Sequence, residues 1–441
     1  MKRISISDIL VYSLLFVCIS TSNSWSPFPE TSTGEILRFD KILLFGEANI
    51  YHLFAGLFFL ILFYVKLGPN NDRNILGERN FLKNIFWAYF IPVNILVYLT
   101  VYMKGITLKG LGVYPVMTFF VYLVVVFYIQ DIFLRDKDRK QLSNILTVLE
   151  IFLLYRCFYS IIKYLLGFGL AGLFGWGVRL GTENDFADFF VLLFIIALVR
   201  LLFGRNEGVK YRILHIISII TSSCLCVFSF RRYFWVEVLA ATSIILFFHS
   251  RFNKVVFTKK VAVACCLIVL MIGSVLLAGP DRIADNYYVG RLLTSLTLVS
   301  PRFDSQYGTD TGHRAEIADG WYNVKTNWLL GVTPFGHEKI KRFESAIWQY
   351  GLFIHNAYFQ VWLFYGLLGV ILFILLYVKS IQLGYHVFLK FKNEIGIVLI
   401  SFMVAQMLKN IVWPTAIVNI NLTIIYIFLI SFVLRIKRLA M

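Results

Sequence analysis

A histidine followed by an asparagine opens an apolar run late in the chain, directly after a long hydrophilic segment. His355 could take a proton from a hydroxyl group near neutral pH, because an imidazole titrates in that range. Asn356 is a favourable residue at the start of a helix, so the pair could equally be a helix cap. Position alone leaves a catalytic and a structural interpretation open.

Two adjacent arginines, Arg231 and Arg232, lie in the short stretch 228–235 between two apolar runs. Guanidinium groups at the edge of the hydrocarbon are costly unless they meet anionic partners. Phosphate and diphosphate suit them, because guanidinium binds such oxygens in a bidentate way. We therefore expect these arginines to bind a diphosphate. Snorkelling toward bulk phospholipid headgroups is the alternative.

Further polar candidates lie in two other hydrophilic stretches, 175–185 and 311–321. A lone arginine in a soluble loop is most often a surface residue, so these stretches gain weight only in combination with other motifs. The candidates are Arg179, Asn184, His313, Arg314, Glu316 and Trp321.

The sequence does not indicate a metal centre. No His-Glu-x-x-His motif occurs, and His313 and His337 have no ligand-like spacing to each other or to a carboxylate cluster. Asp310 and Glu316 would instead orient the guanidinium of Arg314 or contact sugar hydroxyls. We expect chemistry without a metal ion or other cofactor.

The composition indicates that lipid is the solvent of this chain. Of the 441 residues, 59% are hydrophobic and only 15% are charged, against about 25% charged in an ordinary soluble domain. A backbone that crosses lipid must satisfy its own hydrogen bonds, and long continuous apolar runs then select helices. We predict an all-α, polytopic integral membrane protein.

Apolar runs of spanning length, about 17–25 residues each, predict about twelve transmembrane helices. They lie near 7–23, 47–66, 83–103, 112–134, 142–166, 186–203, 212–229, 234–249, 261–278, 356–378, 395–412 and 415–434.

Lysine and arginine cluster at both chain ends and in alternate connections, including the tract 379–392 between the tenth and eleventh spans. With twelve spans these tracts all fall on one side, so the positive-inside rule places both termini in the cytoplasm. His215, His249 and His386 then lie at cytoplasmic ends of spans, where we interpret them as interfacial polar side chains.

One external segment is much longer than the others. It contains charges of both signs and several tryptophans, which indicates a folded external subdomain. The predicted organisation is transmembrane helices one to nine over 1–278, a large external loop with catalytic residues over 279–355, and helices ten to twelve over 356–441.

The net charge of +17 does not indicate nucleic-acid binding, because the basic residues lie in short tracts between apolar runs. The six cysteines all lie within apolar runs, so neither a disulfide framework nor a cysteine metal site is predicted.

An ordered set of motifs resembles the O-antigen ligase and polymerase superfamily. Gly-x-Arg is followed by a tryptophan, then by Leu-Leu-Gly-Val-x-Pro-Phe-Gly, then by His-Asn at the start of an apolar helix that continues to Tyr-Gly-Leu-Leu-Gly. The resembling core covers about 311–375. A long, late external loop among many spans agrees with it.

The resemblance implies a metal-independent membrane glycosyltransferase with a glycosyltransferase-C-like helical architecture. His355 matches the loop-end histidine, Arg314 the loop arginine, and Arg231 or Arg232 the arginine at the outer end of the seventh span. The family usually has Ser or Thr directly before that last arginine, whereas Phe230 precedes Arg231 here, so which arginine aligns is open. The remaining substrate-binding candidates are Arg179, Asn184, His313, Glu316, Trp321 and Asn356.

The resemblance also implies the substrates and the location. The donor would be a glycan on undecaprenyl diphosphate, and the acceptor a sugar hydroxyl on a lipid-linked repeat or on lipid A core. Membrane lipids are further expected partners, and a chain-length regulator is a possible one. The expected location is the bacterial inner membrane, with the active site on the periplasmic face.

We favour a polymerase over a ligase, because nothing in the sequence indicates a specialised acceptor. A ligase that attaches the glycan to lipid A core is the alternative. A flippase for lipid-linked oligosaccharide is a third hypothesis, although it would be expected to carry polar residues near the bilayer midplane and internal repeats.

Overall fold

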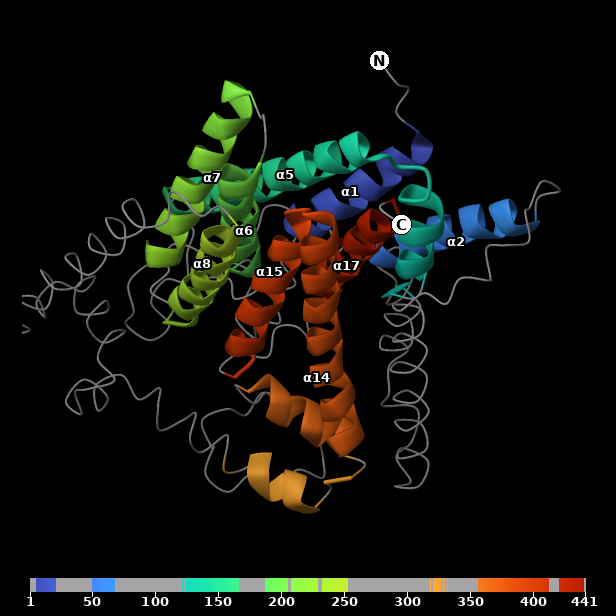
Figure 1. The fold of residues 1–441 in the computed structure, drawn as a ribbon. Coiled ribbons are helices and arrows are strands. Elements are labelled where there is room, and N and C mark those ends of the chain that lie inside the picture. The colour runs from blue at the N-terminus through green and yellow to red at the C-terminus, as the bar shows by residue number, and fades with distance from the viewer. Residues whose placement is uncertain are drawn as a thin grey trace, which may run out of the picture.

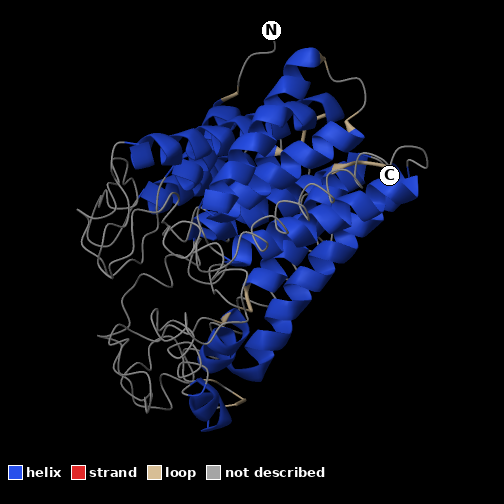
Figure 2. Cartoon of the chain, turned by 90° about the vertical axis from the view of Figure 1, so that its left-hand side faces the viewer, coloured by secondary structure: helices blue, strands red, loops and turns tan. Residues whose placement is uncertain are grey.

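A computed structural model of the chain describes residues 5–20, 50–67, 121–122, 124–165, 187–204, 208–228, 232–252, 318, 320–326, 328–329, 331, 356–411 and 420–439. Within these residues the regular secondary structure is helical, and no strand occurs (Figure 2). The predicted all-α class is confirmed.

The described helices follow the predicted spans closely (Figure 1). They are α1 (Ile6–Ser20), α2 (Ile50–Leu67), the π-helical turn η5 (Ile129–Phe133), α5 (Arg139–Leu165), α6 (Ala187–Phe203), α7 (Val209–Phe228), α8 (Arg232–Phe252), α14 (Ala357–Phe391), α15 (Ile395–Lys409) and α17 (Ile420–Leu439). The expected spans 83–103 and 261–278 lie outside the described residues, so the count of twelve stays a prediction.

Several helices are long and apolar enough to cross a membrane. The segments Arg139–Ile162, Val209–Cys226, Phe234–Arg251 and Tyr365–Phe391 meet both conditions, and shorter apolar helices accompany them. Together with the helical architecture, this makes the chain a polytopic integral membrane protein.

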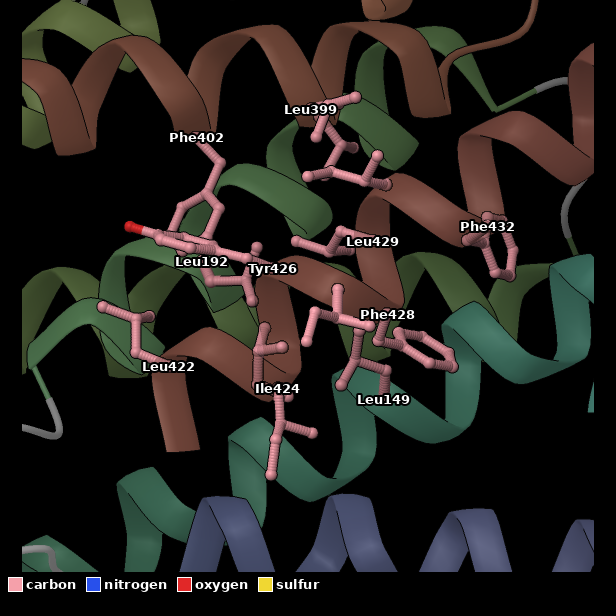
Figure 3. Packing of buried hydrophobic residues seen from close by; sticks show 14 of the residues in the cluster. Leu149, Leu192, Leu399, Phe402, Leu422, Ile424, Tyr426, Phe428, Leu429 and Phe432 are labelled. Atoms are coloured by element: carbon pink, nitrogen blue, oxygen red, sulfur yellow. The ribbon is translucent and has the colours of Figure 1, made fainter. Parts of the chain in front are cut away.

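The packed core lies where α5, α6, α15 and α17 meet (Figure 3). Leu192 of α6, Phe402 of α15 and Tyr426 of α17 are buried there, and the Phe402 and Tyr426 rings are 5.4 Å apart. A helix that is apolar all round must be covered on every side or face lipid. α6 is covered, whereas α2 and α7 leave many large apolar side chains exposed, as lipid-facing helices do.

The tenth span differs from its prediction, which ended the helix at residue 378 and placed a basic loop over 379–392. α14 continues to Phe391, so that end was wrong. Lys390 of this tract lies in the last turn of α14, where the negative end of the helix dipole stabilises its charge. α14 also bends sharply at Gly366, whose φ of 68° and ψ of −171° are not helical.

α14 and α15 approach each other most closely through two glycines. A Cβ at Gly384 would lie 2.7 Å from the Gly396 carbonyl oxygen, and a Cβ at Gly396 would meet the Gly384 carbonyl. Small residues of this kind let membrane helices pack backbone to backbone. The pair fixes how α15 runs along α14.

Two ends of the described chain meet at one place. Lys137, in the turn before α5, forms an ion pair with Asp8 in the first turn of α1. The Lys137 carbonyl accepts hydrogen bonds from Arg435 near the end of α17, at 3.2 Å. The start of α1 and the end of α17 therefore both contact Lys137.

Candidate active site

Asn356 is the predicted site residue that the structure describes most fully, and it caps α14. Its Oδ1 accepts a hydrogen bond from the Phe359 N–H at 3.0 Å. Its Nδ2 donates to the Ile411 carbonyl at 2.9 Å, and the Ala357 N–H donates to the Asn410 carbonyl at 2.7 Å. The capping interpretation is confirmed, and the start of α14 is held against the end of α15.

The first leg of α14 folds back beside the second leg. The rings of Tyr358 and Phe373 pack 5.8 Å apart, and the Asn410 side chain donates to the Tyr377 hydroxyl at 2.9 Å. Phe373, which packs against Tyr358, follows the bend at Gly366 by about 10 Å of helix, at about 1.5 Å per residue. The start of α14 is therefore recessed by about that distance from the tip of the bend, which reaches beyond the end of α15 (Figure 1).

A buried network of ionisable and amide side chains lies at the same end of α15. Lys409 forms an ion pair with Asp188, and Gln406 donates to Asp188 Oδ1 at 2.7 Å and to Glu237 Oε1 at 3.1 Å. The Tyr426 hydroxyl donates to Gln406 Oε1 at 2.9 Å. We call these five buried residues the polar network. It joins α6, α8, α15 and α17.

The dipoles of α6 and α15 stabilise the charges of Asp188 and Lys409. Asp188 lies in the first turn of α6, where unpaired N–H groups create positive potential, and Lys409 lies in the last turn of α15, where carbonyls create negative potential. The start of α6 and the end of α15 therefore attract each other as dipoles and through the ion pair.

The predicted diphosphate-binding arginines belong to the connection that leads into this network. Arg232 is the first residue of α8, and Arg231 lies outside the described residues. The Trp235 indole donates to the Cys226 carbonyl at 3.0 Å, which fastens the start of α8 to the end of α7. Glu237, farther along α8, is the network residue that this helix supplies.

Trp321 belongs to a short helical segment, 320–326, that lies at the tip of α14 (Figures 1 and 2). Its ring contacts Phe359 and Trp362 edge-on, each at 6.2 Å between centroids. The Trp328 carbonyl accepts hydrogen bonds from the Trp362 indole at 2.8 Å and from the Leu367 N–H at 2.9 Å. This part of the predicted external loop is therefore docked on both sides of the α14 bend.

Other predicted site residues lie outside the described residues, and their roles stay predictions. They are Arg179, Asn184, Arg231, His313, Arg314, Glu316 and His355. Two of them precede helices that meet at the polar network, and a third precedes the start of α14. Asn184 shortly precedes α6, Arg231 precedes α8, and His355 precedes the Asn356 cap.

Sequence reasoning missed the polar network. The available signal was that Asp188, Glu237 and Lys409 stand within or beside apolar runs, where a charge is expensive unless it is paired. Among the described residues, no group of three or more His, Cys, Asp or Glu side chains could hold a metal ion. The expectation of metal-free chemistry stays a prediction.

A second buried cluster lies at the other end of α6. Glu150 bonds to His215 Nδ1 at 2.7 Å and lies 3.4 Å from Arg200, which also donates to Thr147 at 2.7 Å. His215 is completely buried, so its interpretation as an interfacial side chain was wrong. The charged partners across α5 and α6 explain why this histidine is found inside the protein.

Comparison with known proteins bears on the central part of the chain. Residues 217–374 match the family model described as O-antigen ligase. The matched segment runs from α7 into α14 and contains Arg231, Arg232, Arg314 and His355. No curated protein sequence matches the chain.

The family match agrees with the resemblance carried by the motifs of 311–375, and with the apolar helices. Members of the family are glycosyltransferase-like membrane enzymes that act on lipid-linked glycans and saccharide acceptors. Residues 217–374 are thus similar to the O-antigen ligase family, which supports the resemblance to the O-antigen ligase and polymerase superfamily.

Proposed function

We propose that this protein transfers a glycan from undecaprenyl diphosphate to a sugar hydroxyl, on the periplasmic face of a bacterial inner membrane. The observation that carries the proposal is the Asn356 cap, which fastens the start of α14 to the end of α15. His355 immediately precedes that cap in the chain. The fold thus supports a reaction centre where α14, α15 and the start of α8 come together.

The proposed reaction is a single displacement at the anomeric carbon. The acceptor hydroxyl oxygen forms the new bond to that carbon, and the bond to the diphosphate oxygen breaks with its electron pair leaving on undecaprenyl diphosphate. His355 accepts the hydroxyl proton as general base, an effect worth about a hundred- to ten-thousand-fold in rate. Attack opposite the leaving group inverts the anomeric centre.

The arginines stabilise the leaving diphosphate. Negative charge grows on the departing oxygen, and a guanidinium at that point lowers the barrier because it binds the charge more strongly in the transition state. We assign Arg314 and one or both of Arg231 and Arg232 to this role. One such contact is worth about 2.7–4 kcal/mol in comparable sites.

The recessed start of α14 suits a donor that stays in the lipid. A diphosphate attached to a polyprenyl chain lies near the headgroup level, below any soluble part of the protein. A reaction centre withdrawn by about 10 Å from the tip of the α14 bend can meet it there. The docked segment 320–326 lies at that tip, on the side expected for the glycan.

We favour a polymerase, in which the acceptor is a second lipid-linked repeat. The ligase alternative has one specific observation in its favour, which is the description of the matching family as O-antigen ligase. The two activities differ in the acceptor alone, so a direct assay separates them.

The test uses purified protein in detergent with an undecaprenyl-diphosphate-linked glycan as donor. Products are resolved by gel and mass spectrometry for the wild type, His355→Ala and Arg314→Ala. A ladder of multiples that disappears in both variants supports a polymerase. Products that require lipid A core support the ligase, and transport of the donor without any transfer would overturn both.

His386→Ala is the matched control. This histidine is exposed on α14 near the end opposite His355, so its removal should leave transfer unchanged. If His386→Ala abolished transfer as His355→Ala does, the loss could not be assigned to a catalytic base.

A further inference from the structure

We infer that the polar network of Asp188, Glu237, Gln406, Lys409 and Tyr426 is a positioning device, which holds the reactive histidine in register with the bound diphosphate. The inference rests on the proposed function, because it concerns the same site. Its residues touch neither substrate nor reacting atoms in the proposed mechanism, and they act through α15.

The polar network fixes the end of α15. Gln406 and Lys409 are both on the last turns of that helix, and both are completely or almost completely buried. The Lys409 ammonium and the Gln406 amide share Asp188, while Gln406 also reaches Glu237. The end of α15 is thereby fastened to the start of α6 and to the second turn of α8.

The end of α15 in turn holds the start of α14. The last carbonyls of a helix have no partner within the helix. Here the carbonyls of Met407, Asn410 and Ile411 accept hydrogen bonds from the Tyr358 hydroxyl at 2.9 Å, the Ala357 N–H at 2.7 Å and the Asn356 amide at 2.9 Å. Three successive residues of α14 therefore depend on where α15 ends.

Burial of the charged network residues costs free energy. A buried ion pair stabilises a fold poorly, because both charges lose their hydration, and apolar replacements are often equally stable. Within the described residues, Asp188 Oδ2 and Glu237 Oε2 have no hydrogen-bond partner. Burying these charged and polar groups is costly, so stability alone does not account for the network. Directional bonds that fix one arrangement explain it better.

The network residues come from inside and outside the segment that matches the family. Glu237 lies within the segment 217–374 that matches the family, whereas Asp188, Gln406 and Lys409 lie outside it. The network therefore links α8, which directly follows Arg231, to α6 and α15, which lie on either side of the matched segment in the chain. A displacement of about 1 Å in a reacting group can lower a rate by up to about a hundred-fold.

The decisive variant removes both charges of the ion pair, Asp188→Asn with Lys409→Met, so that neither partner is left buried and unpaired. We expect kcat per folded molecule to fall by about ten- to a hundred-fold while KM for the donor stays within about two-fold, since binding of the diphosphate is left to the arginines. The single variant Asp188→Glu, with Lys409 kept, retains both charges of the ion pair and should keep most of the wild-type kcat.

Hydrogen exchange provides a measurement that needs no activity. The amides of Ala357 and Phe359 are protected by the Asn410 carbonyl and the Asn356 cap. In the double variant they should exchange at least about ten times faster, because the end of α15 is no longer fixed. Exchange in the middle of α6 should change little.

Glu150→Gln is the matched control. It alters a buried, charged cluster in which Glu150 of α5 lies 3.4 Å from Arg200 of α6, at the end of α6 that does not contact α15 through the polar network. It should lower stability without changing kcat per folded molecule or the exchange of Ala357.

The outcomes are distinct. Wild-type kcat together with unchanged exchange in the double variant would overturn the positioning role. An equal loss of kcat in Glu150→Gln would also overturn it, since the effect would then be general destabilisation. A wild type that is as inactive as His355→Ala would overturn the proposed function, while faster exchange in the double variant alone would still establish the link from α15 to α14.

Discussion

The side-chain amide of Asn356 donates to the main-chain carbonyl of Ile411 at 2.9 Å, across the junction between α14 and α15. The same side chain caps its own helix through the Phe359 N–H. Asn356 thus contacts both the start of α14 and the end of α15, and it directly follows the histidine that we propose as the base.

Two substitutions of Asn356 separate these functions. Asn356→Ala removes the cap, which costs about 1 kcal/mol, and the bond to Ile411, which costs about 0.5–1.5 kcal/mol. Asn356→Asp keeps an acceptor for Phe359 but cannot donate to Ile411. We expect thermal unfolding in detergent to show a clear loss for Ala and a smaller loss for Asp, with transfer reduced in both. Full transfer in Asn356→Asp would show that the bond to Ile411 does not position the site.

The bend of α14 depends on Gly366, whose φ of 68° and ψ of −171° lie in a region that is essentially restricted to glycine. Gly366→Ala should therefore lower the free energy of unfolding by about 1–3 kcal/mol. It should also weaken the docking of Trp328, because the Leu367 N–H that bonds the Trp328 carbonyl follows the bend.

Unfolding monitored by tryptophan fluorescence gives the stability of Gly366→Ala, and limited proteolysis between 326 and 356 reports the docking. Faster cleavage is expected in this variant than in Gly56→Ala, where a new Cβ meets no atom within 4 Å. Equal cleavage of the two variants would contradict a role for the bend in holding the external segment.

The contact between Gly384 and Gly396 makes a different prediction about stability. A methyl group at Gly384 would lie 2.7 Å from the Gly396 carbonyl and 2.9 Å from the Ile400 side chain, so the two helices would have to separate. Gly384→Ala should cost about 1–3 kcal/mol, as overpacking does. Gly56→Ala should instead be neutral or gain up to about 1 kcal/mol, since alanine favours a helix. A Gly384→Ala variant as stable as Gly56→Ala would show that α14 and α15 do not pack this closely.

Most helices could be predicted from the sequence because their apolar runs are long and uninterrupted. α7 was expected over 212–229 and occurs at Val209–Phe228, and the cap at Asn356 was one of two stated interpretations. Local information is sufficient for such features, since apolar length and capping residues act within a few turns.

The bend and the polar network could not be predicted in the same way. Gly366 lies in the run Tyr365-Gly-Leu-Leu-Gly369, which is compatible with a continuing helix, and the docking of Trp328 that accompanies the bend comes from a distant segment. Lys409 and Asp188 are 221 residues apart. A lone charge in an apolar run indicates that a partner exists, but only the folded arrangement identifies it.

The choice between Arg231 and Arg232 leads to the last prediction. Lysine keeps the charge but loses the bidentate geometry, so the arginine that contacts the leaving diphosphate should lose about a hundred- to a thousand-fold in kcat on substitution by lysine. The other arginine, if it faces phospholipid headgroups, should tolerate lysine, since a snorkelling ammonium serves there as well.

Arg231→Lys, Arg232→Lys and the double variant should therefore be compared in transfer assays over a range of donor concentrations. Arg139→Lys, at the exposed first residue of α5, is the control that should remain fully active. A loss confined to one single variant, with no further loss in the double variant, would assign the diphosphate-binding residue. Full activity in the double variant would exclude this pair from the site and leave the leaving group to Arg314.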